Sequence, residues 1–168
     1  MFFAQNLSMN NVSVIIRNKN EESWIGHSIQ AVLEFLDSPE IIVVNNESTD
    51  DSMEIVRSFK HDPSLKKNIR SYGDINILEI NEYTPGKALN MATKHASNKY
   101  ILILSAHSVI TKLDSEYVLN KLSEYDCIFG KQIPVLRGKK IKPRYIWSHF
   151  IDEEKINMYS SLEDRYFI

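Results

Sequence analysis

Short apolar runs alternate along this chain with segments whose apolar residues recur at helical spacing. The runs predict strands at 12–16, 41–44, 75–80, 100–104 and 127–129. Helices are predicted between and after them, from Ile25 to Leu36, Met53 to Phe59, Ala88 to Ala96 and Val118 to Tyr125. Strands that alternate with helices in this way predict an α/β fold with a mainly parallel central sheet flanked by helices.

Two of the predicted strands are strongly apolar, which bears on their place in the sheet. The run 41–44 is apolar on both faces, as expected of a strand buried inside a parallel sheet. The run 100–104 is the most apolar of all, and we therefore expect it near the middle of the sheet.

Polar residues before two of the helices predict how these helices begin. Asn20 can cap the first helix with its side-chain oxygen, and Glu21 and Glu22 then suit the positive end of the helix dipole. Thr84 is the predicted cap of a later helix, with Pro85 at the first helical position, where its missing N–H costs nothing.

Composition fits a single globular domain and excludes several classes of protein. The 168 residues are 43% hydrophobic and 25% charged, which excludes disordered and fibrous chains. A net charge of −2 argues against nucleic acid as a partner, because duplex binding needs a broad basic face. The single cysteine, Cys127, excludes a disulfide framework and favours a cytoplasmic setting. No apolar run approaches the roughly 20 residues that cross a bilayer, which leaves peripheral binding to a membrane surface open.

The regular pattern weakens after residue 132, where basic and aromatic residues mix. We divide the chain into an N-terminal extension at 1–11, a core at 12–132 and the start of a further region at 133–168. The chain ends on the apolar run Tyr166-Phe-Ile168, so we expect this last region to be incomplete.

Polar loops follow the predicted strands at the edge where parallel sheets bind their ligands, the carboxyl ends of the strands. These loops are 17–20, 45–46 and 105–107. The sequence contains neither a Gly-x-Gly-x-x-Gly loop after the first strand nor a Gly-Lys-Ser/Thr phosphate loop, which removes most support for a dehydrogenase or a P-loop enzyme. A nucleotidyltransferase would need a glycine-rich basic loop, and 17–20 has no glycine.

Four motifs stand in the order and spacing of a known family. They are Val12-Ser-Val-Ile-Ile16 with Asn20, Ile41-Ile-Val-Val-Asn-Asn-Glu-Ser-Thr-Asp50, Pro85-Gly-Lys-Ala-Leu-Asn90 and Tyr100-Ile-Leu-Ile-Leu-Ser-Ala-His107. They resemble family 2 of the inverting glycosyltransferases, which typically reads Val-Ser-Val-Ile-Ile-Pro-x-Tyr-Asn, Ile-Val-Val-Asp-Asp-Gly-Ser-x-Asp, Gly-x-x-x-Asn and an Asp-x-Asp triplet. The resemblance covers about residues 12–132 and implies a Rossmann-like GT-A fold that holds a nucleotide sugar in its crevice.

The resemblance implies that asparagines contact the base of the donor. The family places an acid after the second strand for this purpose, and Asn45 and Asn46 stand there. An amide both donates and accepts, so it suits uracil, thymine or cytosine. These asparagines can instead simply cap the turn. Asn18 and Asn20 stand where the family contacts the base and opens the first helix.

Three further residues are donor-binding candidates by the same resemblance. Lys87 suits a phosphate near a helix N-terminus, although a solvated lysine is the plainer reading. Asn90 matches the family's asparagine, which ties loops together. Gln132 lies in Gly130-Lys131-Gln132-Ile-Pro134. It would line the sugar pocket or form a structural turn.

The triplet is where this chain departs from the family. Ser105, Ala106 and His107 replace Asp-x-Asp, whose last acid binds Mn²⁺ or Mg²⁺ in the family. Ser105 can still contact ribose. His107 can bind a divalent cation, meet the diphosphate directly without a metal, or be structural. Rhamnosyltransferase-like members of the family that build bacterial surface polysaccharides also read Ser-Ala-His there, followed by Gly-Arg-Gln-x-Pro.

The resemblance implies a glycosyltransferase that moves a sugar, with inversion, from a nucleotide sugar to a glycan or lipid-linked acceptor. The setting would be bacterial surface (capsular or O-antigen) polysaccharide synthesis at the inner face of the membrane, with homodimer formation left open. Glu163 and Asp164 are the candidates for the general base, and a solvated charge pair is the alternative. The rival function is a non-catalytic nucleotide-sugar-binding or scaffolding domain.

Overall fold

The computed structural model describes residues 11–60 and 74–140, which divide into two compact units between Tyr117 and Val118. The candidate bases Glu163 and Asp164 lie outside the described residues. The division of the chain into 1–11, 12–132 and 133–168 stays a prediction. Among the described residues, no helix has the length and apolar character needed to cross a membrane.

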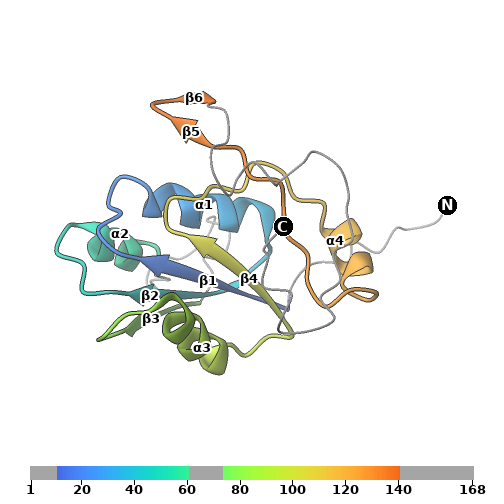
Figure 1. Ribbon diagram of the computed structural model, residues 1–168, viewed down its shortest axis with the longest axis horizontal. Helices are drawn as coiled ribbons and strands as arrows, with labels where there is room; N and C mark the ends of the chain where they lie inside the picture. Colours follow the sequence, from blue (N-terminus) through green and yellow to red (C-terminus); the bar gives the residue numbers. More distant parts are fainter. Residues whose placement is uncertain (1–10, 61–73, 141–168) are drawn as a thin grey trace, which may run out of the picture. The chain divides into compact units, whose positions relative to one another are not determined.

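The first unit contains a four-stranded parallel sheet in the order β3-β2-β1-β4. Its strands are β1 (Val12–Asn18), β2 (Glu40–Asn45), β3 (Ile75–Glu79) and β4 (Tyr100–Ser105). Its helices are α1 (Ile25–Phe35), α2 (Ser52–Ser58) and α3 (Pro85–His95). Helices α1 and α2 lie on one face of the sheet and α3 lies on the other (Figure 1). The predicted α/β class with a parallel sheet is confirmed.

The core lies around β1 and β2, whose apolar side chains are buried on both faces of the sheet. The prediction that 41–44 is a buried strand is confirmed, since all four side chains are 0% exposed. Under α3, a cluster joins alternate strand residues to the helix; its members are Ile15, Ile42, Val44, Ile80, Ala88 and Ala92. The period of two along each strand sends the intervening residues to the face that α1 and α2 cover.

The prediction that 100–104 lies near the middle of the sheet is wrong for the described strands. β4 is the last strand in the order, beside β1, and its Ile101 and Ile103 are 38% and 49% exposed. An apolar run favours a buried strand, but the crossovers decide which strands become its neighbours. Along the chain, β2 and β3 are added on one side of β1, and β4 is then added on the other side. The strand order therefore reverses between β1 and β4, which is the point where open sheets bind ligands.

The prediction that Asn20 caps the first helix is wrong. Helix α1 begins at Ile25, and an extra turn intervenes, in which the Glu21 carbonyl oxygen accepts the Trp24 N–H and the Ile25 N–H, both at 2.9 Å. Asn20 has a φ of 52°, in the left-handed region, whereas a capping residue has an extended backbone. Glu21 and Glu22 consequently precede the helix, and its first turn carries no acidic residue.

The start of α3 agrees with its prediction. Thr84 is the N-cap, and its Oγ1 accepts the Lys87 N–H at 3.1 Å. Pro85 lies in the first turn, where the backbone N–H that proline lacks would have no acceptor within the helix.

Helix α4 (Ser115–Lys121) begins before the predicted segment and ends before Tyr125. The predicted strand 127–129 is wrong, because these described residues are irregular and exposed. A strand needs a neighbour that supplies ladder hydrogen bonds, and residue type alone does not provide one.

The second unit contains an unpredicted antiparallel hairpin of β5 (Val135–Leu136) and β6 (Lys139–Lys140). Arg137 and Gly138 turn it with φ of 50° and 74°, as two-residue hairpin loops require.

Candidate functional site

Polar residues from four strands meet at the carboxyl edge of the sheet. The register pairs Asn18 with Asn45, Asn45 with Glu79, and Arg17 with Ser105. Because the strands are parallel, their last residues lie side by side. Segments far apart in sequence therefore present one polar edge.

Asn18 joins the end of β1 to the start of α2. Its side chain is buried, and its Nδ2 donates to Ser52 Oγ at 2.9 Å and to Ser48 Oγ at 3.1 Å. Its Oδ1 is buried and has no hydrogen-bond partner among the described residues. A buried acceptor without a partner costs folding free energy. The two serine contacts of Nδ2 hold the side chain in this orientation despite that cost.

Asn45 is held from both sides. Its Nδ2 donates to Glu79 Oε2 at 2.8 Å, and its Oδ1 accepts the Ser48 N–H at 3.4 Å. The second bond is the turn-capping role that the sequence left open as an alternative. The predicted site residues did not include Glu79, although an acidic residue near the end of a predicted strand is a signal that could have found it.

Asn46 contrasts with its neighbour. Its backbone N–H donates to the Asn18 carbonyl oxygen at 3.0 Å, but its half-buried side chain makes no hydrogen bond within the described parts of the chain. Of the two predicted base contacts, Asn46 is therefore the one whose side-chain amide has no hydrogen-bond partner among residues 11–60 and 74–140.

Asn20 and Glu22 connect the loop after β1 to the loop after β2. Asn20 Oδ1 accepts the Thr49 N–H at 2.8 Å, and the Glu22 N–H donates to Asp50 Oδ2 at 2.9 Å. Desolvation opposes ionisation of Asp50, but hydrogen bonds from the Ser52 hydroxyl and from the backbone outweigh it and hold the pKa of Asp50 below its ordinary value. These contacts fix both loops at the edge of the sheet.

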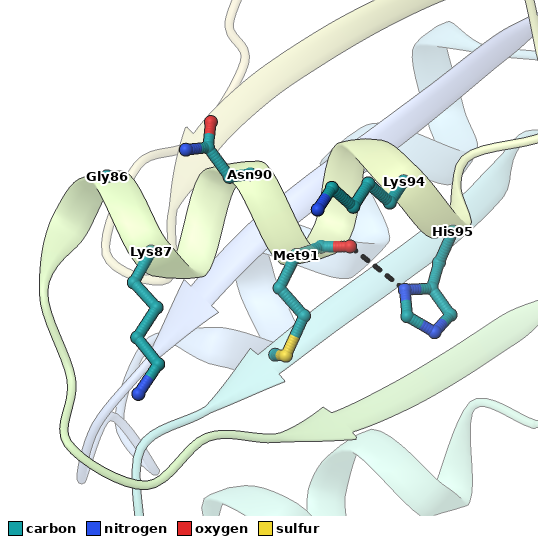
Figure 2. Close-up of a pocket in the computed structure, with 6 residues that line it drawn as sticks. All are labelled: Gly86, Lys87, Asn90, Met91, Lys94 and His95. Atoms are coloured by element: carbon teal, nitrogen blue, oxygen red, sulfur yellow. Dashed lines mark hydrogen bonds between the residues drawn. The ribbon is translucent and has the colours of Figure 1, made fainter.

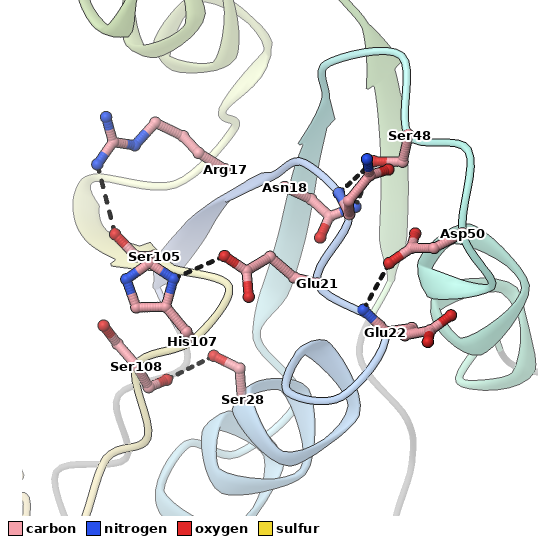
Figure 3. A network of polar contacts seen from close by, with 11 residues as sticks. Arg17, Asn18, Glu21, Glu22, Ser28, Ser48, Asp50, Ser105, His107 and Ser108 are labelled. Atoms are coloured by element: carbon pink, nitrogen blue, oxygen red, sulfur yellow. Dashed lines mark hydrogen bonds and ion pairs between the residues drawn. The ribbon is translucent and has the colours of Figure 1, made fainter. Parts of the chain in front are cut away.

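The Ser-Ala-His segment follows β4 directly and packs against β1. Ala106 is buried, and its N–H donates to the Arg17 carbonyl oxygen at 3.2 Å. Ser105 Oγ accepts a long hydrogen bond of 3.5 Å from Arg17 Nη2 (Figure 3). Arg17 Nε is buried without a partner among the described atoms. Arg17, which stands where the family reads proline, brings a positive charge to this point.

His107 is the exposed member of the segment, with 60% of its side chain accessible. Its Nδ1 lies 2.8 Å from Glu21 Oε1, in the turn before α1 (Figure 3). A second contact holds the same loop to α1, since Ser28 Oγ donates to the Ser108 carbonyl oxygen at 2.6 Å. Neither Glu21 nor Ser28 was predicted as a site residue, because nothing in their spacing reveals partners so distant in sequence.

Lys87 and Asn90 lie on α3, which starts beyond the carboxyl end of β3. Lys87 Nζ donates to the Asn81 carbonyl oxygen at 2.9 Å and lies 3.5 Å from Glu82 Oε2. Asn90 is exposed and points to another side of the helix (Figure 2). A shallow depression runs along α3, lined by Gly86, Lys87, Asn90, Met91, Lys94 and His95. The roles predicted for Lys87 and Asn90 stay predictions.

Gln132 belongs to the second unit, where it is exposed. Its role in a sugar pocket stays a prediction.

A divalent cation would find few protein ligands here. No group of three or more His, Cys, Asp or Glu side chains that could hold a metal occurs in 11–60 and 74–140. His107 brings one imidazole nitrogen, Nε2, because its Nδ1 faces Glu21 Oε1, and imidazole suits a borderline ion such as Mn²⁺ better than Mg²⁺. Water or a bound ligand would have to supply the remaining oxygen ligands.

Comparison with known proteins places this geometry in a family. Residues 13–166 match the model of Glycosyl transferase family 2. Poly(ribitol-phosphate) beta-N-acetylglucosaminyltransferase TarS of Staphylococcus aureus is 30% identical over 104 residues, which are 60% of this chain and 17% of TarS. An uncharacterized glycosyltransferase of Rickettsia bellii is 32% identical over 120 residues, 71% of this chain and 16% of that protein.

A solved structure has the same fold. The crystal structure of S. aureus TarS 1-349 in complex with UDP aligns with a TM-score of 0.54 at 22% identity, covering 69% of this chain and 33% of that one. This likeness shows the fold, which is the GT-A fold with its parallel sheet. The chain spans only 16% to 17% of the length of the curated relatives named above. Since the family model matches nearly the whole sequence, this chain belongs to glycosyl transferase family 2.

Proposed function

We propose that this chain is the nucleotide-sugar-binding part of an inverting glycosyltransferase, with its donor at the carboxyl edge of the sheet. The observation that carries the proposal is the meeting of Arg17, Ser105 and His107 where the strand order reverses between β1 and β4. Family membership and the shared fold support it.

The base of the donor binds at the end of β2. Asn45 is buried and engaged with Glu79 and Ser48, whereas the amide of Asn46 is half-buried and makes no hydrogen bond to the described residues. Asn46 is therefore the better contact for the polar edge of a pyrimidine, because a free amide can match both a donor and an acceptor. Asn18 and Asn20 act indirectly, because their hydrogen bonds fix the loops that follow β1 and β2.

The diphosphate binds at the end of β4. Ser105 offers a hydroxyl to the ribose, while the Arg17 guanidinium and the His107 ring provide positive charge or hydrogen bonds for the phosphates. His107 is the residue that would hold a divalent cation, which would supply positive charge to neutralise the leaving group. Lys87 and Gln132 complete the donor contacts in this proposal, and Asn90 ties the neighbouring loops.

Transfer proceeds by direct displacement. The acceptor oxygen attacks the anomeric carbon from the face opposite the diphosphate, the bond from that carbon to the diphosphate oxygen breaks, and the nucleoside diphosphate leaves with the bonding electrons. A carboxylate takes the proton of the acceptor hydroxyl. Glu163 and Asp164 are the proposed candidates for this base.

The acceptor is a glycan or lipid-linked molecule in bacterial surface polysaccharide synthesis, at the inner face of the membrane. The Ser-Ala-His segment, which resembles that of the rhamnosyltransferase-like subgroup, supports this setting, as does the similarity to a poly(ribitol-phosphate) glycosyltransferase. Peripheral membrane association and a homodimer belong to the same proposal.

Thermal-shift binding of UDP, dTDP, GDP and CMP, with and without Mn²⁺, tests donor binding, because a ligand raises the unfolding temperature of the state that it binds. We expect one nucleotide to stabilise the chain and His107→Ala to abolish most of that shift. His95→Ala is the matched control, since His95 is an exposed histidine whose Nδ1 contacts the Met91 carbonyl oxygen on α3. No shift with any nucleotide would refute the proposal.

Catalysis is tested separately, with the longest form of the protein that can be expressed. Transfer or hydrolysis from a panel of nucleotide sugars is the expected result. Nucleotide binding without any turnover would favour the rival function, a non-catalytic nucleotide-sugar-binding domain.

A further inference from the structure

The contact between Glu21 and His107 joins two segments that are both anchored by other bonds. The carbonyl oxygen of Glu21 accepts two backbone N–H groups in the turn before α1, both at 2.9 Å. On the other side, the Ser108 N–H donates to the Ser105 carbonyl oxygen at 2.9 Å and Ala106 is buried. Isolated surface ion pairs contribute little because two mobile side chains must be ordered. Here the backbone on both sides is already held, so the pair can set the orientation of the ring.

The chemistry of the pair decides which nitrogen of His107 carries a proton. The carboxylate of Glu21 can only accept, so Nδ1, at 2.8 Å, must be the donor. The neutral ring then presents a lone pair at Nε2, and the protonated ring presents an N–H there. Because 60% of the His107 side chain is accessible, Nε2 is available for a ligand in either state.

We infer that Glu21 is a positioning residue for the donor site, which fixes the ring and the tautomer of His107 so that Nε2 faces the diphosphate. This inference rests on the proposed function of His107 and assigns a role to a residue outside the family motifs. Glu21 touches neither donor nor acceptor in this arrangement. Carboxylates that hold the second nitrogen of a ligating histidine act in the same way at metal sites.

Glu22 provides a matched control. It is the adjacent acid, and its Oε2 accepts the Asp51 N–H at 3.1 Å, away from His107. Glu22→Gln makes the same change of charge as Glu21→Ala and keeps an oxygen for the Asp51 N–H. A difference between the two variants therefore reports the contact with His107 and not the loss of one negative charge.

The first measurement reads the tautomer directly. The chain holds five histidines, and ¹⁵N-histidine labelling with a long-range ¹H–¹⁵N correlation distinguishes their ring nitrogens, with the His107→Ala spectrum assigning the signal. In buffer alkaline enough for a neutral ring, we expect Nδ1–H in the wild type and in Glu22→Gln. We expect a shift toward Nε2–H in Glu21→Ala. A wild-type ring with Nε2–H, or no change in Glu21→Ala, would overturn the inference.

The second measurement links the ring to the donor, with UDP titrated by calorimetry with and without Mn²⁺. We expect Glu21→Ala to weaken UDP about tenfold, the lower end of the losses seen when the partner of a ligating imidazole is removed. The double variant with His107→Ala should bind no more weakly than His107→Ala alone. If the tautomer changes as expected but His107→Ala leaves UDP affinity intact, the assignment of His107 to the donor is wrong, and the donor-directed role of Glu21 is wrong with it. If His107→Ala weakens UDP and Glu21→Ala does not, only the positioning role is wrong.

Discussion

The side-chain amide of Asn45 donates a hydrogen bond to Glu79 Oε2 at 2.8 Å, across the carboxyl ends of two neighbouring strands. This contact gives a physical reason for the amide at a position where the family reads an acid. A carboxylate at position 45 would face the carboxylate of Glu79 in a site where Asn45 is only 4% exposed. Two like charges this close repel each other even though Glu79 itself is exposed, whereas an amide donor satisfies the acid.

Asn45→Asp should therefore destabilise the fold by about 2 kcal/mol, because it replaces a buried donor with a second acceptor. Adding Glu79→Gln should restore most of the loss, since the glutamine amide can donate to the new aspartate. Urea unfolding of the single and double variants measures both effects. Equal stability of Asn45→Asp and the wild type would contradict the account. So would a double variant whose loss of unfolding free energy exceeds the sum of the losses in the two single variants.

Asn18→Ala should cost about 1–3 kcal/mol of folding stability. The substitution removes the Nδ2 group that ties Ser48 and Ser52 to the end of β1 and leaves those hydroxyls without this donor. Asn46→Ala is the comparison, because no hydrogen bond of its side chain is lost in the described structure. It should change the unfolding free energy by less than about 0.5 kcal/mol while weakening nucleotide binding. If the two variants unfold alike, the buried Asn18 contacts do not contribute as argued.

Glu40 should make the stability of the protein depend on pH in the acid range. Burial opposes ionisation of Glu40, but hydrogen bonds from the Ser13 hydroxyl and from the Ser97 N–H and hydroxyl outweigh it and hold its pKa below the ordinary 4.5. Folding thus favours the ionised form. The stabilisation is complete above the unfolded-state pKa and is lost as pH falls through the folded-state pKa.

Glu40→Gln should accordingly lower stability by about 1 kcal/mol at pH 7, a figure reduced for solvent screening of this partly exposed group, and by much less below pH 3. Thermal unfolding across this range measures the difference. Glu34→Gln, a change at an exposed acid on α1, serves as the control and should match the wild type throughout. A constant deficit at every pH would show that charge on Glu40 is not the cause.

Gly26 is needed where α1 packs against α2. A Cβ at this position would lie 3.2 Å from Ile55 Cγ2. Gly26→Val should therefore cost about 1–3 kcal/mol through overpacking. Gly86→Ala on α3 meets no atom within 4 Å and should stabilise by up to about 1 kcal/mol, because alanine favours the helix. The ranking of the two melting temperatures against wild type tests both statements, and a neutral Gly26→Val would refute the first.

The sequence by itself determined the elements of the core and the family. Periods of two and 3.6 are local properties, so the strands 12–16 and 41–44 and the cap at Thr84 could be predicted from the order of residue types alone. The spacing of the four motifs led to the glycosyltransferase family, which the family model confirms over residues 13–166.

Tertiary structure alone decided how those elements meet. It placed β4 beside β1, turned Asn20 from a predicted cap into a link between loops, and brought Glu79 to Asn45. Glu21 and His107 lie 86 positions apart in sequence, and no local preference records their contact. Such pairs depend on which strands become neighbours, and that choice is made by the burial of whole faces rather than by any single segment.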